Sequence, residues 1–175
     1  MNIQKDLLEC IGNYLHASEE TVATAESVTA GFLQFSFSQV KDASKIFKGG
    51  MTVYTLEEKV KFLNIDEEEA EACNCVSQNI SDTMALNVAK SFGTDWGMAI
   101  TGYATPVEES DFKLFAYFSF AYKGEVVLSR KMDLNSRKDS ISAQLCYSEF
   151  MLECLKVEIE NQQIRKEEKG KEEES

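Results

Sequence analysis

The apolar positions of the chain repeat with two different periods, one typical of helices and one typical of strands. Between residues 3 and 17 they are spaced by one, three and four, which predicts an amphipathic helix with one face made of Ile3, Leu7, Leu8, Ile11 and Leu15. Similar spacing, or acidic residues suited to a first helical turn, predicts further helices over residues 29–37, 56–63, 65–72, 77–91 and 136–160. Ser77 is the expected N-cap of the helix that follows it.

Short apolar and β-branched runs lie between these helices and predict strands. They cover residues 21–25, 51–55 and 95–102. The second is expected to start just after Gly49-Gly50, where two glycines interrupt regular structure. Residues 113–122 and 125–132, joined by Lys123-Gly124, predict a β-hairpin. Strands that alternate with helices and end in a hairpin predict an α/β protein: a three-layer α/β/α sandwich with a mixed, mainly parallel sheet.

Length and charge narrow the range of functions. The chain has 175 residues and is 43% hydrophobic, so we expect a single domain over residues 1–160. Residues 161–175 end in RKEEKGKEEES and predict a charged, solvated tail without fixed structure. The formal charge of −12 disfavours binding to nucleic acid or to an anionic membrane. Since there is neither a signal-peptide pattern nor a long apolar run, we expect a cytoplasmic protein.

The five cysteines do not show the spacing of a disulfide framework, and we expect them to be reduced. Cys73 and Cys75 form a C-x-C pair, but no second pair follows and the single histidine, His16, is far away in the sequence. We therefore expect no metal site and no cofactor.

Three polar stretches follow the three predicted strands at their carboxyl ends, where ligands bind in open α/β sheets. They are Glu26–Thr29, Tyr54–Lys59 and Thr101–Thr105. A serine just before a helix can be approached by backbone N–H donors and by the positive end of the helix dipole. Ser27 is thus a candidate nucleophile, and Lys59 is the candidate base because His16 is expected on a buried, remote helix. The alternatives are an N-capping Ser27 and a solvated Lys59, which leave only a possible site for an anionic or amide ligand.

Four segments carry a resemblance to a known family: TVATAESVTAGFL, FKGGMTVYTLEEKVKFLNI, CVSQNISDTMALNVAKSFGTDWGMAITGYATP and NSRKDSISAQ. In order and approximate spacing they resemble the CinA C-terminal domain family, whose active members are nicotinamide mononucleotide (NMN) deamidases, over roughly residues 5–155. The resemblance implies a Ser/Lys amidohydrolase with Ser27 as nucleophile, Lys59 as base and Tyr54 as a positioning or relay hydroxyl. The substrate-binding residues that we expect are Glu26, Thr29, Thr101, Gly102, Thr105 and Arg137, the last as a contact to the substrate phosphate. Family members also suggest a homo-oligomer.

The chain departs from the family pattern mainly after the third strand. The usual T-G-I-A-G-P-G-G reads Thr101-Gly-Tyr-Ala-Thr-Pro-Val-Glu here, so three glycines are replaced by Thr105, Val107 and Glu108. This loop should reshape the substrate wall and add negative charge to it. Three interpretations stay open: a deamidase acting on NMN or a related small amide, a catalytically silent paralogue that binds a nucleotide or a protein partner, and an unrelated α/β binding domain.

Overall fold

The computed structural model describes residues 5–173 as seven α-helices, one 3-10 turn and five strands. The helices are α1 (Lys5–Ala17), α2 (Phe32–Ser38), α3 (Ala43–Ile46), α4 (Leu56–Leu63), α5 (Glu67–Ala72), α6 (Gln78–Phe92) and α7 (Ser140–Glu173), and the 3-10 turn is η1 (Glu108–Ser110). The strands are β1 (Val22–Glu26), β2 (Phe47–Thr52), β3 (Trp96–Tyr103), β4 (Leu114–Tyr122) and β5 (Glu125–Leu134).

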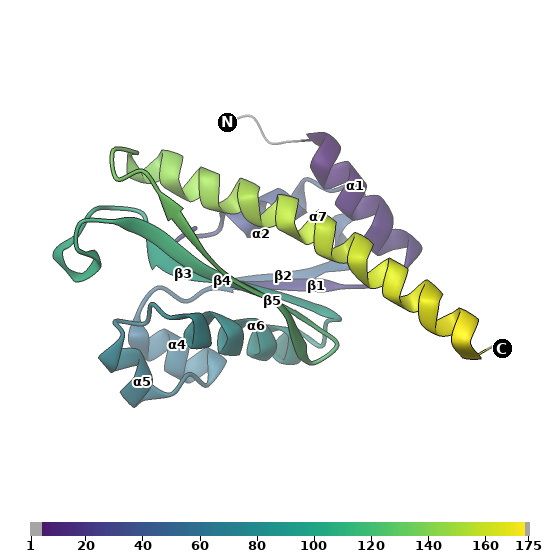
Figure 1. Ribbon diagram of the computed structural model, residues 1–175, viewed down its shortest axis with the longest axis horizontal. Coiled ribbons are helices and arrows are strands. Elements are labelled where there is room, and N and C mark those ends of the chain that lie inside the picture. The colour runs from purple at the N-terminus through teal and green to yellow at the C-terminus, as the bar shows by residue number, and fades with distance from the viewer. Residues whose placement is uncertain (1–4, 174–175) are drawn as a thin grey trace.

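The strands form one mixed sheet in the order β2-β1-β3-β4-β5. β1 pairs in parallel with both β2 and β3, whereas β4 is antiparallel to β3 and to β5. Helices α1, α2 and α7 cover one face of the sheet, and α4, α5 and α6 cover the other (Figure 1). The expected single-domain α/β/α sandwich is therefore confirmed.

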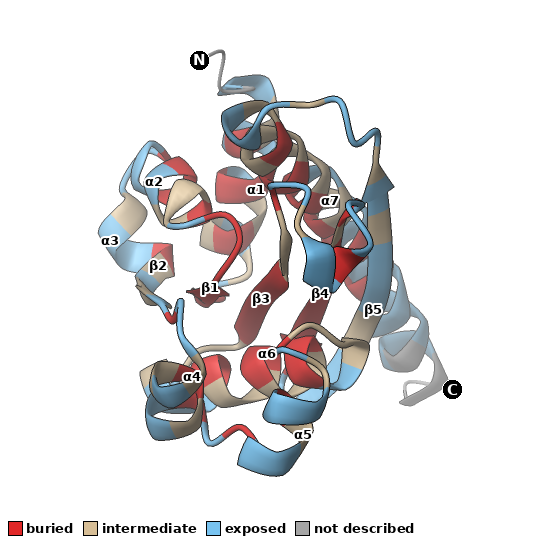
Figure 2. Ribbon diagram, turned by 90° about the vertical axis from the view of Figure 1, so that its left-hand side faces the viewer, coloured by how far each residue is buried: buried red, intermediate tan, exposed pale blue. Residues whose placement is uncertain are grey.

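The two faces of the sheet differ in the size of their side chains. Toward α1 and α7 the strands present bulky residues that form the larger core: Trp96, Met98, Ile100, Leu114, Phe118 and Phe120. Toward α6 they present small ones: Ala23, Ala25, Ala99, Ala121 and Gly97. Strands β1 and β3 are buried between the two layers (Figure 2).

Most of the predicted elements are confirmed, and the differences have local causes. Strand β2 passes through Gly49-Gly50 instead of beginning after them. Gly50 lies within the strand because β1 packs closely against it: a Cβ at Gly50 would lie 2.2 Å from Thr24 Oγ1 of β1. Helix α2 starts at Phe32, since Ala30 and Gly31 have positive φ angles of 51° and 105° and form a turn. Helix α3 and the turn η1 were not predicted. Of the first predicted helix, Ile3 lies outside the described residues.

The last helix extends much further than the sequence pattern predicts. It continues through Glu173, so the expected tail without structure is helical over residues 161–173. Glu, Gln, Lys and Arg are good helix formers, and the segment is tied to the domain: Gln162 is buried against Glu158, and Lys166 Nζ lies 2.6 Å from the buried carboxylate of Glu20. No helix among residues 5–173 is both long and apolar enough to cross a membrane.

Candidate active site

The loop between β1 and α2 is shaped by the carboxylate of Glu26, which is fully buried. Glu26 accepts backbone N–H bonds from Gly31, Leu33 and Gln34 at 2.8–3.1 Å and a hydroxyl bond from Thr29 at 2.7 Å. A carboxylate at this place satisfies the unpaired donors of the first turn of α2. The positive end of α2 is therefore occupied, and it does not serve Ser27 as the sequence analysis expected.

Ser27 follows directly and is held in a fixed position. Its backbone N–H donates to the carbonyl of Ile100 in β3 at 3.1 Å, and the carbonyl of Val28 accepts a bond from Gln144 of α7 at 2.9 Å. Ser27 is 7% exposed. The nucleophile candidate is thus anchored by the sheet on one side and by the last helix on the other.

Lys59 reaches Ser27 from the buried side of α4, which Thr55 caps at its N-terminus. Its Nζ lies 3.1 Å from Ser27 Oγ and donates to the backbone carbonyl of Tyr54 at 3.2 Å. Only 2% of Lys59 is exposed. No carboxylate is paired with its amine among the ion pairs of the described residues.

Burial lowers the pKa of the Lys59 amine, because the charged form loses its hydration, and the nearby Cys75 opposes this shift only in part. Burial likewise raises the pKa of the Cys75 thiol. A neutral amine has a lone pair that can accept the proton of the Ser27 hydroxyl. The geometry and the lowered pKa together suit a nucleophile and its base.

Ser27 and Lys59 lie in a cavity of about 570 Å³ at the carboxyl ends of the parallel strands. Its walls come from the loops after β1, β2 and β3, the α5–α6 connection and the start of α7. The polar residues that line it are Ser27, Tyr54, Thr55, Lys59, Glu71, Asn74, Cys75, Thr101, Tyr103, Thr105, Glu109, Ser140 and Gln144.

The structure brings together most, but not all, of the predicted site residues. Tyr54, Thr101, Gly102 and Thr105 line the cavity with Ser27 and Lys59. Tyr54 is 67% exposed at the rim, and its contact to Lys59 is made by the backbone carbonyl rather than by the hydroxyl. The Thr101 hydroxyl donates to the carbonyl of Cys75 at 2.8 Å and so holds the α5–α6 connection.

The other three predicted substrate-binding residues do not line the cavity. Glu26 and Thr29 are fully buried and bond to each other beneath the loop, where they fix the position of Ser27. Arg137 is exposed in the turn before α7, and its backbone N–H donates to the side chain of Asn135.

The wall formed by the α5–α6 connection was not predicted from the sequence. Asn74 and Cys75 both have positive φ angles, 51° and 59°, and Asn74 Nδ2 donates to the Tyr103 hydroxyl at 3.0 Å. The C-x-C pattern of Cys73-Asn-Cys75 by itself indicates only a possible pair of metal ligands. The available signal was an asparagine between two predicted helices, since Asn tolerates left-handed backbone and marks turns.

All five cysteines are free thiols. No group of three or more His, Cys, Asp or Glu side chains within residues 5–173 is arranged to hold a metal ion.

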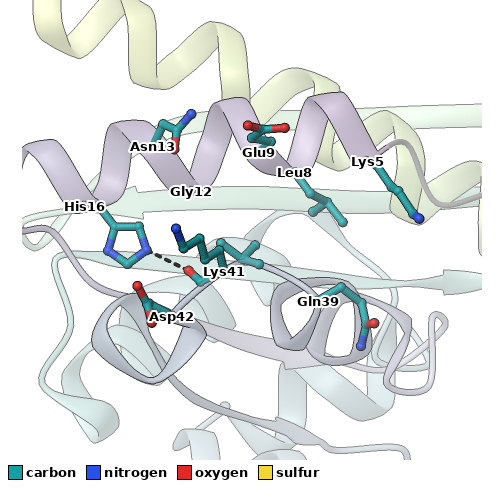
Figure 3. A pocket seen from close by; sticks show the side chains of 10 residues that line it. Lys5, Leu8, Glu9, Gly12, Asn13, His16, Gln39, Lys41 and Asp42 are labelled. Carbon is teal, nitrogen blue, oxygen red and sulfur yellow. Dashed lines mark hydrogen bonds between the residues drawn. The ribbon is translucent and has the colours of Figure 1, made fainter.

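A second cavity, of about 700 Å³, lies between α1 and residues 39–42 (Figure 3). Its lining includes Lys5, Glu9, His16, Lys41 and Asp42, but no serine, threonine or cysteine. His16 is only partly buried, contrary to expectation, and its Nε2 lies 2.8 Å from the carbonyl oxygen of Lys41. The larger cavity therefore lacks a hydroxyl or thiol nucleophile, and His16 lines this cavity rather than that of Ser27.

Two solved structures share the fold over nearly the whole chain. A CinA superfamily protein from Klebsiella pneumoniae has a TM-score of 0.83 at 21% identity, covering 92% of this chain and 99% of that one. A competence or damage-inducible protein from Enterobacter asburiae also has a TM-score of 0.83, at 24% identity, covering 91% and 99% of the two chains. At these identities the likeness shows the fold.

Sequence comparisons identify the family. A CinA-like protein of Synechocystis is 43% identical over 96 residues, 55% of this chain and 23% of the relative. A CinA-like protein of Prochlorococcus marinus is 31% identical over 140 residues, 79% of this chain and 33% of the relative, so this chain spans about a third or less of either protein. The family match itself covers residues 4–156, from the start of α1 into α7, and includes every residue that lines the Ser27 cavity: the chain belongs to the CinA C-terminal domain family.

Proposed function

We propose that the chain is a Ser/Lys amidohydrolase that releases ammonia from the carboxamide of NMN or of a related small amide. The observation that carries this proposal is the 3.1 Å approach of the buried Lys59 amine to the Ser27 hydroxyl on the wall of a cavity. Family membership supports the same reaction class. The assignment to NMN comes from the resemblance of the motifs around Ser27, Tyr54 and Lys59.

In the first half-reaction, neutral Lys59 accepts the proton of Ser27 as Oγ attacks the carboxamide carbon. The C–O bond forms while the carbonyl electron pair moves to oxygen, giving a tetrahedral intermediate. Lys59 then returns its proton to the amide nitrogen. The C–N bond breaks, ammonia leaves, and the acyl group stays on Ser27 as an ester.

The second half-reaction uses the same base. Lys59 accepts a proton from a water molecule, whose oxygen attacks the ester carbon. Collapse of the second tetrahedral intermediate breaks the bond to Ser27 Oγ, which recovers the proton from Lys59. The products are a carboxylic acid and the original enzyme, so Lys59 ends each half-reaction neutral and water is the only co-reactant.

Ammonia release from NMN and from a small panel of nicotinamide derivatives tests the proposal. We expect Ser27→Ala to lower kcat/KM by at least about 10³-fold, because without the serine hydroxyl the amide can be attacked only by water. Ser38→Ala is the matched control: Ser38 is exposed at the end of α2, outside the cavity, and its replacement should leave the rate unchanged.

The two ways in which this test can fail have different meanings. Turnover that persists in Ser27→Ala would show that another group is the nucleophile. No turnover of any amide by the unaltered protein would favour a silent relative that binds its ligand without converting it. Melting curves with and without each amide would then identify which one is bound.

A further inference from the structure

The charges around the Ser27 cavity are unusual for a site that would hold a phosphate. Among the described residues that line it, Lys59 is the one cationic side chain, and it is buried against Ser27 with its pKa lowered. Two carboxylates, Glu71 and Glu109, also line the cavity, and both are exposed. The exposed charged side chains of the described wall are therefore both acidic.

Helix N-termini, which often bind phosphate, are already occupied around this cavity. Glu26 caps α2, and α4 is capped by Thr55 and carries Glu57 and Glu58 in its first turn. At the start of α7, Asp139 accepts a backbone and a hydroxyl bond from Ser142 at 3.0 and 2.6 Å. These bonds lower the pKa of Asp139, so this carboxyl is ionised at neutral pH. A phosphate would meet more negative charge at each of these helix ends.

The wall also offers two aromatic side chains. Tyr54 and Tyr103 line the cavity from the loop after β2 and from the end of β3. Tyr103 is held by its hydrogen bond from Asn74 and by an edge-to-face contact with Phe115, whose ring centroid is 5.3 Å away. The faces of aromatic rings attract cations. The two carboxylates on the same cavity wall attract a cation as well.

We infer that the site selects a phosphate-free carboxamide with a positively charged ring in preference to the same compound carrying a phosphate. This inference rests on the proposed amidohydrolase function and specifies its substrate class. A pyridinium carboxamide on an uncharged sugar has the chemistry that fits: an amide for Ser27, a cation for the acidic, tyrosine-lined wall, and no anion that needs a partner.

Nicotinamide riboside and NMN are suitable probes because they differ only in the phosphate. We expect kcat/KM for the riboside to exceed that for NMN by roughly tenfold at low salt, with the ratio falling as salt is added. A higher kcat/KM for NMN would overturn the inference and leave the amidohydrolase proposal standing. Turnover of neither compound would overturn the proposed function instead.

Binding to the Ser27→Ala protein gives a readout that does not depend on chemistry. Calorimetric titration with the two probes should show tighter binding of the riboside. Equal or tighter binding of NMN would contradict the selection against phosphate, whatever the catalytic result.

A charge reversal with a matched control locates the effect. Glu109→Lys should raise kcat/KM for NMN relative to the riboside by roughly three- to tenfold. Glu108→Lys makes the same change in net charge one residue earlier, on an exposed side chain outside the cavity lining, and should change the ratio less than about twofold. An equal response in both variants would assign the preference to the overall charge of the protein and overturn its assignment to this site.

Discussion

The buried amine of Lys59 determines the pH at which the Ser27–Lys59 pair can work. A protonated amine cannot accept the serine proton, so the proposed mechanism needs the neutral form. Because burial lowers the pKa of Lys59, the neutral form is more abundant near neutral pH than it is for an exposed lysine. The proposed base is therefore a residue whose charged form the fold disfavours by burial.

The first prediction concerns the pH dependence of activity. We expect kcat/KM to rise with pH and to reach a plateau above an apparent pKa, because Lys59 acts as the neutral base. This apparent pKa should lie below the ordinary lysine value. Lys59→Arg should abolish this activity at every pH in the range, since a guanidinium stays charged. Initial rates of ammonia release between pH 6 and 10 measure the profile. Activity that falls with rising pH would contradict the role of Lys59 as base.

The second prediction concerns stability. Since the folded-state pKa of Lys59 lies below its unfolded value, the unfolded chain binds more protons between the two values, and the free energy of unfolding rises with pH across that window. Lys59→Met should therefore keep or raise the melting temperature at pH 7. The expected gain in the free energy of unfolding is about 1.4 kcal/mol for each unit by which the pKa of Lys59 is lowered.

Urea unfolding at pH 7 and pH 10 measures this effect. Lys61→Met, an exposed lysine on the same helix, is the control and should change stability little. A variant Lys59→Met that is clearly less stable than the unaltered protein at pH 7 would show that the buried amine is favourable.

At the scale of elements, α7 is fixed at its far end by Glu20, which ends the turn after α1. The Glu20 carboxylate accepts hydrogen bonds from Trp96 Nε1 at 2.9 Å, from the Tyr122 hydroxyl at 2.6 Å and from Lys166 Nζ at 2.6 Å. Burial by itself raises the pKa of Glu20, but these three bonds outweigh it, and the pKa lies below its ordinary value. One carboxylate thus joins α1, β3, β4 and α7.

The third prediction is that Glu20→Gln lowers the free energy of unfolding by roughly 2 kcal/mol at pH 7, because the amide cannot accept all three bonds. A carboxyl with a depressed folded-state pKa stabilises the protein above its unfolded pKa of about 4.3, and this contribution is lost as pH falls through the folded value. The gap between variant and unaltered protein should therefore narrow in acid. Urea unfolding at pH 7 and pH 3 tests this, with exposed Glu19→Gln as the control.

The sequence predicted the elements that depend on local signals better than those that depend on distant contacts. Helices α4 and α6 were predicted closely, since their apolar spacing and, for α6, the N-cap Ser77 are local signals. The start of β2 and the extension of α7 depend on distant partners: Thr24 lies beside Gly50, and Glu20 binds Lys166. Local patterns do not contain these contacts, so periodicity alone could not predict them.

The site was predictable to a similar extent. The proximity of Ser27 and Lys59 followed from loops at the carboxyl ends of parallel strands, together with the family motifs. The place of Glu26 beneath α2 and the wall at Asn74 did not follow, because a carboxylate next to a serine can face either the ligand or a helix end, and the α5–α6 turn depends on backbone conformation.

At the scale of the whole molecule, the two helical layers lie against the sheet in different ways. The small side chains on the α6 face let that helix come very close: a Cβ at Gly97 would lie 2.1 Å from the Ala85 carbonyl oxygen. The α1 and α7 layer instead packs on large aromatic and aliphatic side chains. The position of α6, and of the α5–α6 wall attached to it, therefore depends on the lack of a side chain at Gly97.

The fourth prediction follows from this close packing. Gly97→Ala should destabilise the protein by roughly 1 to 3 kcal/mol, since either α6 or β3 must move. Gly170→Ala is the control, because a Cβ there meets nothing within 4 Å and alanine is the better helix former. Thermal melting of both variants measures the effect. An unchanged melting temperature in Gly97→Ala would mean that the layers can separate without loss.

The support of the Ser27 loop by α7 has a consequence for how the protein reaches its native state. Lys59 is 32 residues from Ser27 in the chain, but Gln144 is 116 residues from Val28, and Lys166 is 146 residues from Glu20. Contacts between such distant segments require long loops to close, which slows folding. On the ribosome Ser27 is synthesised early, whereas α7, which holds its loop through Gln144, is synthesised last. We therefore expect the Ser27–Lys59 site to be completed in the final steps of folding, once the last helix has docked.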